Sequence, residues 1–290
     1  MDISLGILFA VVAMVCWGFG DFFIQKSLRK VGDWETLFII TLLGSIILLP
    51  FVWVDILPFL QSNITTILIL LGAGVVLLVA ALLEFEALKR GKISVIEPTW
   101  SLEIPSSVLF AFIILNETMG GYQIITIAVL IIGLFMVSYR GSVFSKRFLL
   151  ERGVILSVIA ALTMGVANFF VGWGARTTDP LMVSFIINII SVVASGAFLI
   201  WKGKIGQVIS DMKTYPTLLL KMAVLDNIAW IAFAFAMIYA PIGIAAALSE
   251  SYIIIGVLLG IFINKEKIER HQKIGLVVAV IALLILATQL

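Results

Sequence analysis

The chain has 290 residues, of which 62% are hydrophobic and only 12% are charged, and its mean hydropathy is +1.21. This composition excludes an ordinary water-soluble globular protein and indicates an integral membrane protein. The formal charge of +2 excludes little, because the placement of Lys and Arg matters more than their sum in a membrane protein. With one Cys and one His, the sequence supplies neither an internal disulfide nor a His/Cys metal site or a Cys/His nucleophile pair.

Apolar runs separated by polar or charged residues follow one another along the chain. We expect each run to form a membrane-crossing helix, because a crossing needs about 20 apolar residues and barrel strands would alternate polar and apolar residues. The first run has no basic segment before it and no cleavage signal, so we interpret it as a retained helix rather than a signal peptide. The predicted crossings are residues 3–24, 37–54, 64–88, 93–115, 124–139, 154–173, 181–201, 218–238, 242–263 and 274–287.

Nearly all the basic residues lie on one side of this arrangement. All but two of the 19 Lys and Arg residues fall in the loops that follow odd-numbered crossings, and the exceptions are Lys221, just inside the eighth crossing, and Arg176. Because short cytoplasmic loops are enriched in Lys and Arg, that side is predicted to be cytoplasmic. We therefore predict a multi-pass protein of the plasma membrane with both termini on the non-cytoplasmic side.

The second half of the chain repeats the first. Residues 17–23 (WGFGDFF) align with residues 164–170 (MGVANFF), which places Asp21 over Asn168. Each copy contains five predicted crossings, so the second copy enters the membrane in the opposite orientation, as in many secondary transporters. The predicted fold is an all-α membrane protein of ten transmembrane helices in two inverted five-helix repeats. The copies are predicted at residues 3–140 and 153–288, joined by a cytoplasmic linker at 141–152.

Several short motifs carry a resemblance to a known family. They are Trp17-Gly18 in the first crossing, the Ala-Leu-Lys-Arg-Gly run at residues 87–91, the Leu-Asn-Glu turn at residues 115–117, and Gln123 followed by Gly133. With the ten-helix duplication, they resemble the two tandem EamA domains of the drug/metabolite transporter superfamily over nearly the whole chain. The resemblance implies a secondary transporter of small metabolites. It also implies a substrate cavity formed mainly by crossings one to four and six to nine, with crossings five and ten at the periphery.

Acidic residues occur inside the predicted crossings, where a carboxylate near the bilayer centre costs about 2.5 to 3.5 kcal/mol. Asp21, Glu86 and Glu97 lie within about one turn of the predicted cytoplasmic end, and we interpret them as solvated or paired helix ends. Glu84 has two interpretations: it lines the inner mouth of a pathway, or it extends to the membrane interface.

Glu103, Asp226 and Glu250 are expected near the midplane. Glu103 and Asp226 lie about ten residues, or roughly 15 Å, from the cytoplasmic ends of their crossings, and Glu250 lies about eight residues from the outer end of its own. The sequence places no Lys or Arg at a comparable depth. These carboxyl groups are therefore protonated, or face a hydrated cavity and await a cation, or are neutral acids hydrogen-bonded in helix packing.

Two prolines, Pro98 and Pro105, lie in the predicted fourth crossing. Because proline removes a backbone donor, we expect a kink there that frees carbonyl groups toward a cavity, with ordinary helix bending as the alternative. The corresponding positions of the second copy lack proline, so the two copies are expected to flex unequally.

Aromatic residues accompany the midplane acids at helical spacing. Trp100 precedes Glu103 by three residues and Trp230 follows Asp226 by four, which places each pair on one helix face. Tyr252 lies two residues beyond Glu250. A carboxylate beside aromatic rings suits an amine or quaternary ammonium group. Chance proximity is the alternative, because the sequence contains 20 Phe and 7 Trp.

These observations predict a secondary active transporter of a small organic solute, either cationic or zwitterionic, such as an amine or an amino acid. We expect alternating access coupled to proton or substrate exchange, because no phosphate-binding Gly-rich loop is present to use ATP. Asn168 and Asn227 are expected either to contact the substrate or to form interhelical hydrogen bonds. The candidate substrate-binding residues are Glu84, Trp100, Glu103, Asn168, Asp226, Asn227, Trp230, Glu250 and Tyr252.

The expected partners are the small-molecule substrate and membrane lipid, with no nucleic acid, metal or cofactor. Sodium as the coupling ion and a homodimer are left open. Two alternatives belong to other classes. One is a membrane-embedded enzyme acting on a lipid or polyprenyl substrate, with Asp226 and Glu250 as acid and base, although basic residues or His near the midplane are missing from the sequence. The other is a packing or receptor subunit that transports nothing.

Overall fold

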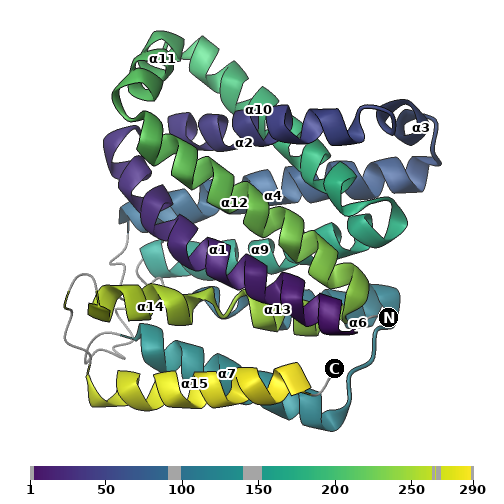
Figure 1. Ribbon diagram of the computed structural model, residues 1–290, viewed down its shortest axis with the longest axis vertical. Helices are drawn as coiled ribbons and strands as arrows, with labels where there is room; N and C mark the ends of the chain where they lie inside the picture. The colour runs from purple at the N-terminus through teal and green to yellow at the C-terminus, as the bar shows by residue number, and fades with distance from the viewer. Residues whose placement is uncertain (1–2, 91–98, 140–151, 263–264, 266–268, 289–290) are drawn as a thin grey trace.

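The computed structural model of the protein describes residues 3–90, 99–139, 152–262, 265 and 269–288, and these form a bundle of helices without strands (Figure 1). The helices are α1 (Ile3–Lys30), α2 (Asp33–Val52), α3 (Ile56–Leu60), α4 (Ile64–Arg90), α6 (Glu103–Leu115), α7 (Gly121–Ser138), α9 (Arg152–Thr177), α10 (Pro180–Trp201), α11 (Ile205–Thr214), α12 (Pro216–Tyr239), α13 (Ile242–Ser249), α14 (Tyr252–Phe262) and α15 (Arg270–Thr288). The predicted all-α fold is confirmed. Glu97, Pro98 and the predicted linker apart from Arg152 lie outside the described residues.

Within those ranges nine helical spans, with α13 and α14 counted together, are long and apolar enough to cross a membrane. The shorter apolar helix α6 supplies the remaining crossing, so the arrangement agrees with the predicted ten. Both chain termini lie at one end of the bundle, on the right in Figure 1, which we name the termini end. The opposite end, where α1 finishes at Lys30 and α15 begins at Arg270, is named the basic end.

The most extensive helix pairs each join one repeat to the other. α1 packs along α12, α4 along α9, α2 along α10 and α7 along α15. The symmetry operation that exchanges the two copies maps the α1–α12 pair onto the α9–α4 pair. It maps the α2–α10 pair and the α7–α15 pair each onto itself. This is the pairing expected of two copies related by a two-fold axis in the membrane plane, so the packing supports the inverted repeat.

Helices α7 and α15 form a separate pair along one edge of the bundle (Figure 1). Glycines allow their backbones to approach closely: a Cβ atom on Gly133 would lie 2.7 Å from the Ala279 backbone nitrogen. The Gln272 side chain adds a hydrogen bond, because its Nε2 donates to the Val137 carbonyl at 3.0 Å. Crossings five and ten therefore lie at the periphery, as the family resemblance implies.

The fourth and ninth crossings are each interrupted part-way through the bundle. Ser101 and Leu102 form a turn before α6 begins, and Glu250 and Ser251 form a turn between α13 and α14. Pro105 fits the first turn of α6, where a backbone donor is not needed. The ninth crossing breaks without proline, and the unequal flexing of the two copies stays a prediction. There the Ser251 hydroxyl donates to the Ala247 carbonyl at 2.7 Å, an interaction that competes with regular helix hydrogen bonds.

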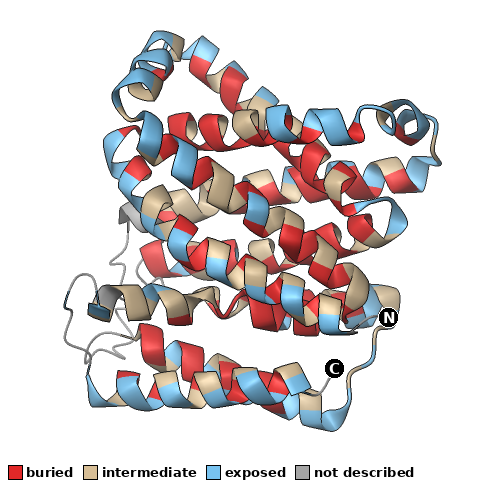
Figure 2. Ribbon diagram, in the orientation of Figure 1, coloured by how far each residue is buried: buried red, intermediate tan, exposed pale blue. Residues whose placement is uncertain are grey.

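Burial follows the requirements of a membrane protein. Figure 2 shows buried residues along the helix faces inside the bundle and exposed residues on the outer faces. Large apolar side chains dominate the exposed set, including Phe51 at 66% and Trp201 at 74% exposure. Apolar outer faces are suited to lipid, and the polar atoms of the buried faces must then find partners or a cavity.

Candidate functional site

A cavity of about 150 Å³ lies inside the bundle, between crossings one to four and six to nine. Its lining includes five carboxyl groups, those of Asp21, Glu84, Glu103, Asp226 and Glu250. Asp21, Glu84 and Glu103 come from the first copy, and the other two come from the second. Neither Lys, Arg nor His is among the described residues that line it. The described lining of the cavity is therefore rich in acidic groups and contains no basic side chain.

Most of the candidate residues predicted from the sequence meet in this cavity. Its lining contains Glu84, Glu103, Asn168, Asp226, Trp230, Glu250 and Tyr252. Trp100 and Asn227 are not part of the lining. Glu103, Asp226 and Glu250, which were predicted from their depth, come from three different crossings and meet here with Glu84. The absence of Trp100 and Asn227 from the lining has local causes.

Trp100 is separated from Glu103 by the helix break. The turn at Ser101 and Leu102 interrupts the regular spacing that would place both side chains on one face. Trp100 is half-buried, and its Nε1 has no hydrogen-bond partner among the described residues. The shared-face prediction assumed a continuous helix through residues 100–103, and this assumption is wrong.

Asn227 joins three helices instead of facing the cavity. Its Nδ2 donates to the Ile40 carbonyl at 3.1 Å and to the Ala223 carbonyl at 2.8 Å, and its Oδ1 accepts from Asn188 Nδ2 at 2.9 Å. Gly44 makes room for these amides, because a Cβ atom there would collide with both. This is the interhelical hydrogen bonding that the sequence left as an alternative for Asn227.

The sequence interpretation of Asp21 as a helix end was wrong. Helix α1 continues to Lys30, beyond the predicted end at residue 24, so Asp21 lies more than two turns from the helix end. It is half-buried and lines the cavity. The internal repeat could have identified Asp21 as a site residue, since it aligns Asp21 with the candidate Asn168. Glu86, by contrast, is half-buried and does not line the cavity.

The two least exposed acids of the cavity lie at the two helix breaks. Glu103 is the first residue of α6 and is 7% exposed, and Glu250 follows α13 and is 6% exposed. Asn168 of α9 donates from Nδ2 to Glu250 Oε1 at 3.0 Å. The negative charge of Glu103 would interact unfavourably with those of Glu250, Glu84 and, more weakly, Asp21. Simultaneous ionisation of all these groups therefore requires accompanying cations.

Aromatic rings form one wall of the same cavity. Trp17 lies edge-on to Trp230, with ring centroids 5.0 Å apart, and its centroid is 6.1 Å from that of Tyr252. All three side chains line the cavity, and Phe233 packs against both tryptophans from outside the lining. Trp17 was not among the predicted site residues, because contacts between α1 and α12 are not visible in the sequence of either helix.

Comparison with known proteins identifies the family. The EamA-like transporter family matches residues 4–139 and again residues 151–288. The chain belongs to the EamA-like transporter family. No curated protein sequence matches it. Among the 28 chains of solved structures that match is the crystal structure of a protein that is 14% identical, with a TM-score of 0.72, over 99% of this chain and 96% of the other. At this identity, the similarity shows the shared fold alone.

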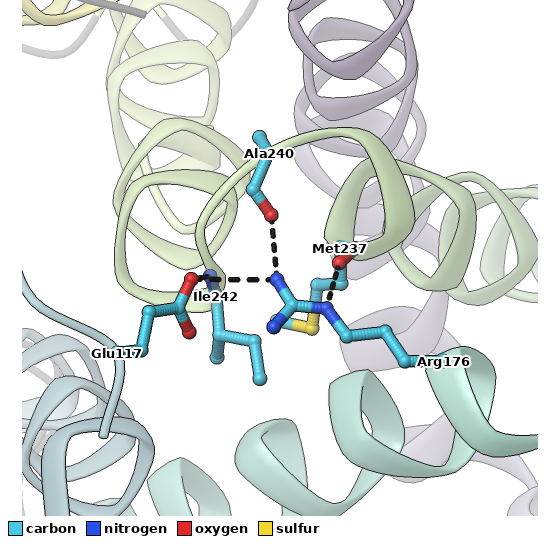
Figure 3. Close-up of polar contacts among 5 residues, drawn as sticks. All are labelled: Glu117, Arg176, Met237, Ala240 and Ile242. Carbon is cyan, nitrogen blue, oxygen red and sulfur yellow. Dashed lines mark hydrogen bonds and ion pairs between the residues drawn. The ribbon is translucent and has the colours of Figure 1, made fainter. Parts of the chain in front are cut away.

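In this EamA-like transporter, a polar network ties together the termini end of the bundle (Figure 3). Arg176, near the end of α9, donates from Nε to the Met237 carbonyl at 2.7 Å and from Nη2 to the Ala240 carbonyl at 2.8 Å. The same Nη2 lies 3.4 Å from Glu117 Oε1, which also accepts from the Ile242 backbone N–H at 2.9 Å. We name these five residues the terminal latch. It joins the α6–α7 loop of the first copy to α9 and the α12–α13 turn of the second.

Proposed function

We propose that the protein is a secondary active transporter of a small organic cation or zwitterion, such as an amine or an amino acid. Transport proceeds by alternating access in exchange for protons or for another substrate molecule. One observation carries this proposal: five carboxyl groups line a single cavity, and the lining described by the structure includes no basic side chain.

The exchange mechanism follows from the charges. A buried carboxylate needs a counter-cation, and neighbouring carboxylates in a cavity of low dielectric constant repel one another. A proton or an ammonium group can provide the positive charge. Because one negative charge cannot stably neutralise both, binding of a cationic solute favours release of protons from the cluster. Reprotonation on the other side of the membrane then favours release of the solute.

The dimensions and aromatic wall of the cavity support a small amine. A cavity of about 150 Å³ holds a molecule of roughly the size of benzene. The rings of Trp17, Trp230 and Tyr252 present apolar surface and π-electron density to the alkyl groups around a charged nitrogen. The carboxyl groups then neutralise the charge, and the rings contact the carbon skeleton.

The position of the cavity relative to the terminal latch supports alternating access. The cavity includes Asp21, Thr41 and Glu84 from the halves of α1, α2 and α4 that lie toward the basic end. At the other end, Arg176 and Glu117 connect the two copies. Since the basic end is predicted to be cytoplasmic, we propose that this state is closed toward the outside of the plasma membrane by the terminal latch. Breaking the latch gives the outward-open state.

The test is uptake of protonated amines into proteoliposomes that contain the purified protein, with and without a pH gradient. Replacing Glu103 with Gln, Asp226 with Asn or Glu250 with Gln should reduce gradient-driven uptake at least tenfold. Adjacent acids on α4 provide a matched comparison: Glu84→Gln should impair uptake, whereas Glu86→Gln should retain it. Full uptake in the cavity variants, or absence of uptake for every amine and amino acid tested, would refute the proposal.

A further inference from the structure

One polar atom at the candidate site lacks a partner. Asn168 lines the cavity and its side chain is fully buried. Its Nδ2 donates to Glu250 Oε1 at 3.0 Å, but its Oδ1 has no hydrogen-bond partner in the described part of the chain. Buried acceptors are almost always paired, so this one needs a donor. Asn168 also lies within hydrogen-bonding reach of Glu103, so the donor is either an occupant of the cavity or the Glu103 carboxyl group when it is protonated.

When Glu250 is ionised, its carboxylate sets the orientation of this amide. Reversing it would place Oδ1 against Glu250 Oε1, an arrangement of two acceptors when the carboxyl group is ionised. The bond to Glu250 therefore uses the amide as a donor and leaves Oδ1 available to accept.

Close packing between α9 and α6 fixes the position of Asn168. One turn earlier on α9, a Cβ atom on Gly165 would collide with the Glu103 carbonyl oxygen. One turn before that, the Leu162 carbonyl accepts a hydrogen bond from Ser106 Oγ at 2.8 Å. These contacts hold α9 against the start of α6, so Asn168 stays beside the two helix breaks and has little freedom to move away.

We propose that Asn168 selects substrates whose charged nitrogen carries hydrogen: its Oδ1 accepts an N–H of the substrate, while its Nδ2 holds the Glu250 carboxylate. This inference rests on the proposed function and specifies its substrate class. Protonated primary, secondary and tertiary amines satisfy the acceptor. A quaternary ammonium ion carries the same charge and can contact the aromatic wall, but it leaves Oδ1 unpaired in a buried position.

Two probe ions differ mainly in this property. Trimethylammonium and tetramethylammonium have the same charge, and the fourth substituent on nitrogen is hydrogen in the first and methyl in the second. Calorimetric titration of the purified protein at neutral pH should show trimethylammonium binding about tenfold to 100-fold more tightly, the range for one hydrogen bond to a charged group.

Variants separate the hydrogen bond from the general effect of charge. Asn168→Leu keeps the approximate volume but removes the acceptor, so the affinity ratio should approach one. Any loss of support for Glu250 affects both ions and cancels in the ratio. Asn168→Asp keeps an acceptor oxygen and should retain a preference for trimethylammonium. Ser195→Ala on α10, which removes a buried hydroxyl outside the cavity lining that is already donated to the Ser191 carbonyl, should leave the ratio unchanged.

The outcomes distinguish this inference from the proposed function. If the wild-type protein binds both ions equally, or if Asn168→Leu keeps the preference, Asn168 does not select for N–H groups; protonated Glu103 would be the alternative donor to Oδ1. The cation site itself would still stand in that case, because both ions bind. If neither ion binds and the carboxyl variants transport normally, the cation site and the role of Asn168 are both refuted.

Discussion

Replacing Arg176 with Met should open the cavity at the termini end. In the wild type, Arg176 donates two hydrogen bonds to the carbonyl groups that finish α12 and pairs with Glu117. Methionine keeps part of the apolar stem but can make none of these contacts. The carboxyl group of Glu117 keeps its hydrogen bond from the Ile242 backbone N–H and loses its counter-charge. The closed arrangement should therefore lose stability relative to an open one.

The structure sets the expected magnitude. Hydrogen bonds to a charged group contribute about 1.5 to 3 kcal/mol each, but the Arg176 side chain is 24% exposed and would be hydrated after opening. We therefore take about 2 to 4 kcal/mol for the whole set, close to the effect of breaking a partly buried ion pair. This corresponds to a shift of about 30- to 900-fold in the equilibrium between closed and open states.

Cysteine labelling measures this shift. Ser184 lines the cavity one turn from the start of α10 at the termini end, and it is 6% exposed. In a Cys16→Ala background, a cysteine introduced at position 184 should react slowly with a membrane-impermeant maleimide added on the termini side. Arg176→Met should raise the rate at least tenfold. Glu117→Gln, which keeps an acceptor for Ile242, should give an intermediate rate, and Lys213→Met on α11 should have no effect. An unchanged rate in a folded Arg176→Met protein would refute the latch.

Three further predictions concern stability and binding. Gly44→Ala should lower the free energy of unfolding by about 2 to 4 kcal/mol in detergent, because the added methyl group collides with the buried amides that join α2, α10 and α12. Gly256→Ala, whose Cβ would meet no atom within 4 Å, should leave thermal stability unchanged or slightly higher, and equal losses in the two variants would contradict the packing argument. Lys204→Met should destabilise the protein by about 1 kcal/mol in thermal unfolding, because it removes the 2.7 Å ion pair with the buried Glu35. The loss should stay small because the Lys204 side chain is 46% exposed. A loss above about 3 kcal/mol would indicate another role for Lys204. Trp17→Leu should weaken trimethylammonium binding about threefold to tenfold by calorimetry while Trp17→Phe retains most of it, and equal affinities in both variants would exclude a ring contact.

Hydropathy and charge were sufficient to predict the membrane-crossing helices because lipid imposes strict requirements on every crossing. Each apolar run needed enough residues to span the membrane, and an incorrect count would have scattered the basic loops across both sides. The short helices α3 and α11 and the two breaks were not predicted. Ser101 and Leu102 lie within an apolar run, so average hydropathy continues through the turn without a signal.

Depth in the membrane was the most informative property for the site. Glu103, Asp226 and Glu250 were selected because a deeply placed carboxyl group requires a physical reason, and the structure gathers them around one cavity. Asp21 was missed because its depth was measured from the end of the apolar run. Helix α1 continues beyond that end to Lys30, so Asp21 lies further from the helix end than expected. Asn227 could not be separated from Asn168 by sequence, since both are amides inside apolar helices and only their contacts across helices distinguish them.

The alignment of Asp21 with Asn168 has a consequence for how such a protein arises by gene duplication. A symmetric dimer of a single ancestral half would carry the same side chain at both positions, either two acids or two amides. Two halves in one chain are free of this constraint, and here one copy has the carboxyl group of Asp21 while the other has the neutral amide of Asn168 next to Glu250. A chain with two different halves can therefore place a carboxyl group in one half and a neutral amide at the equivalent position of the other. Two identical subunits related by symmetry cannot form this arrangement.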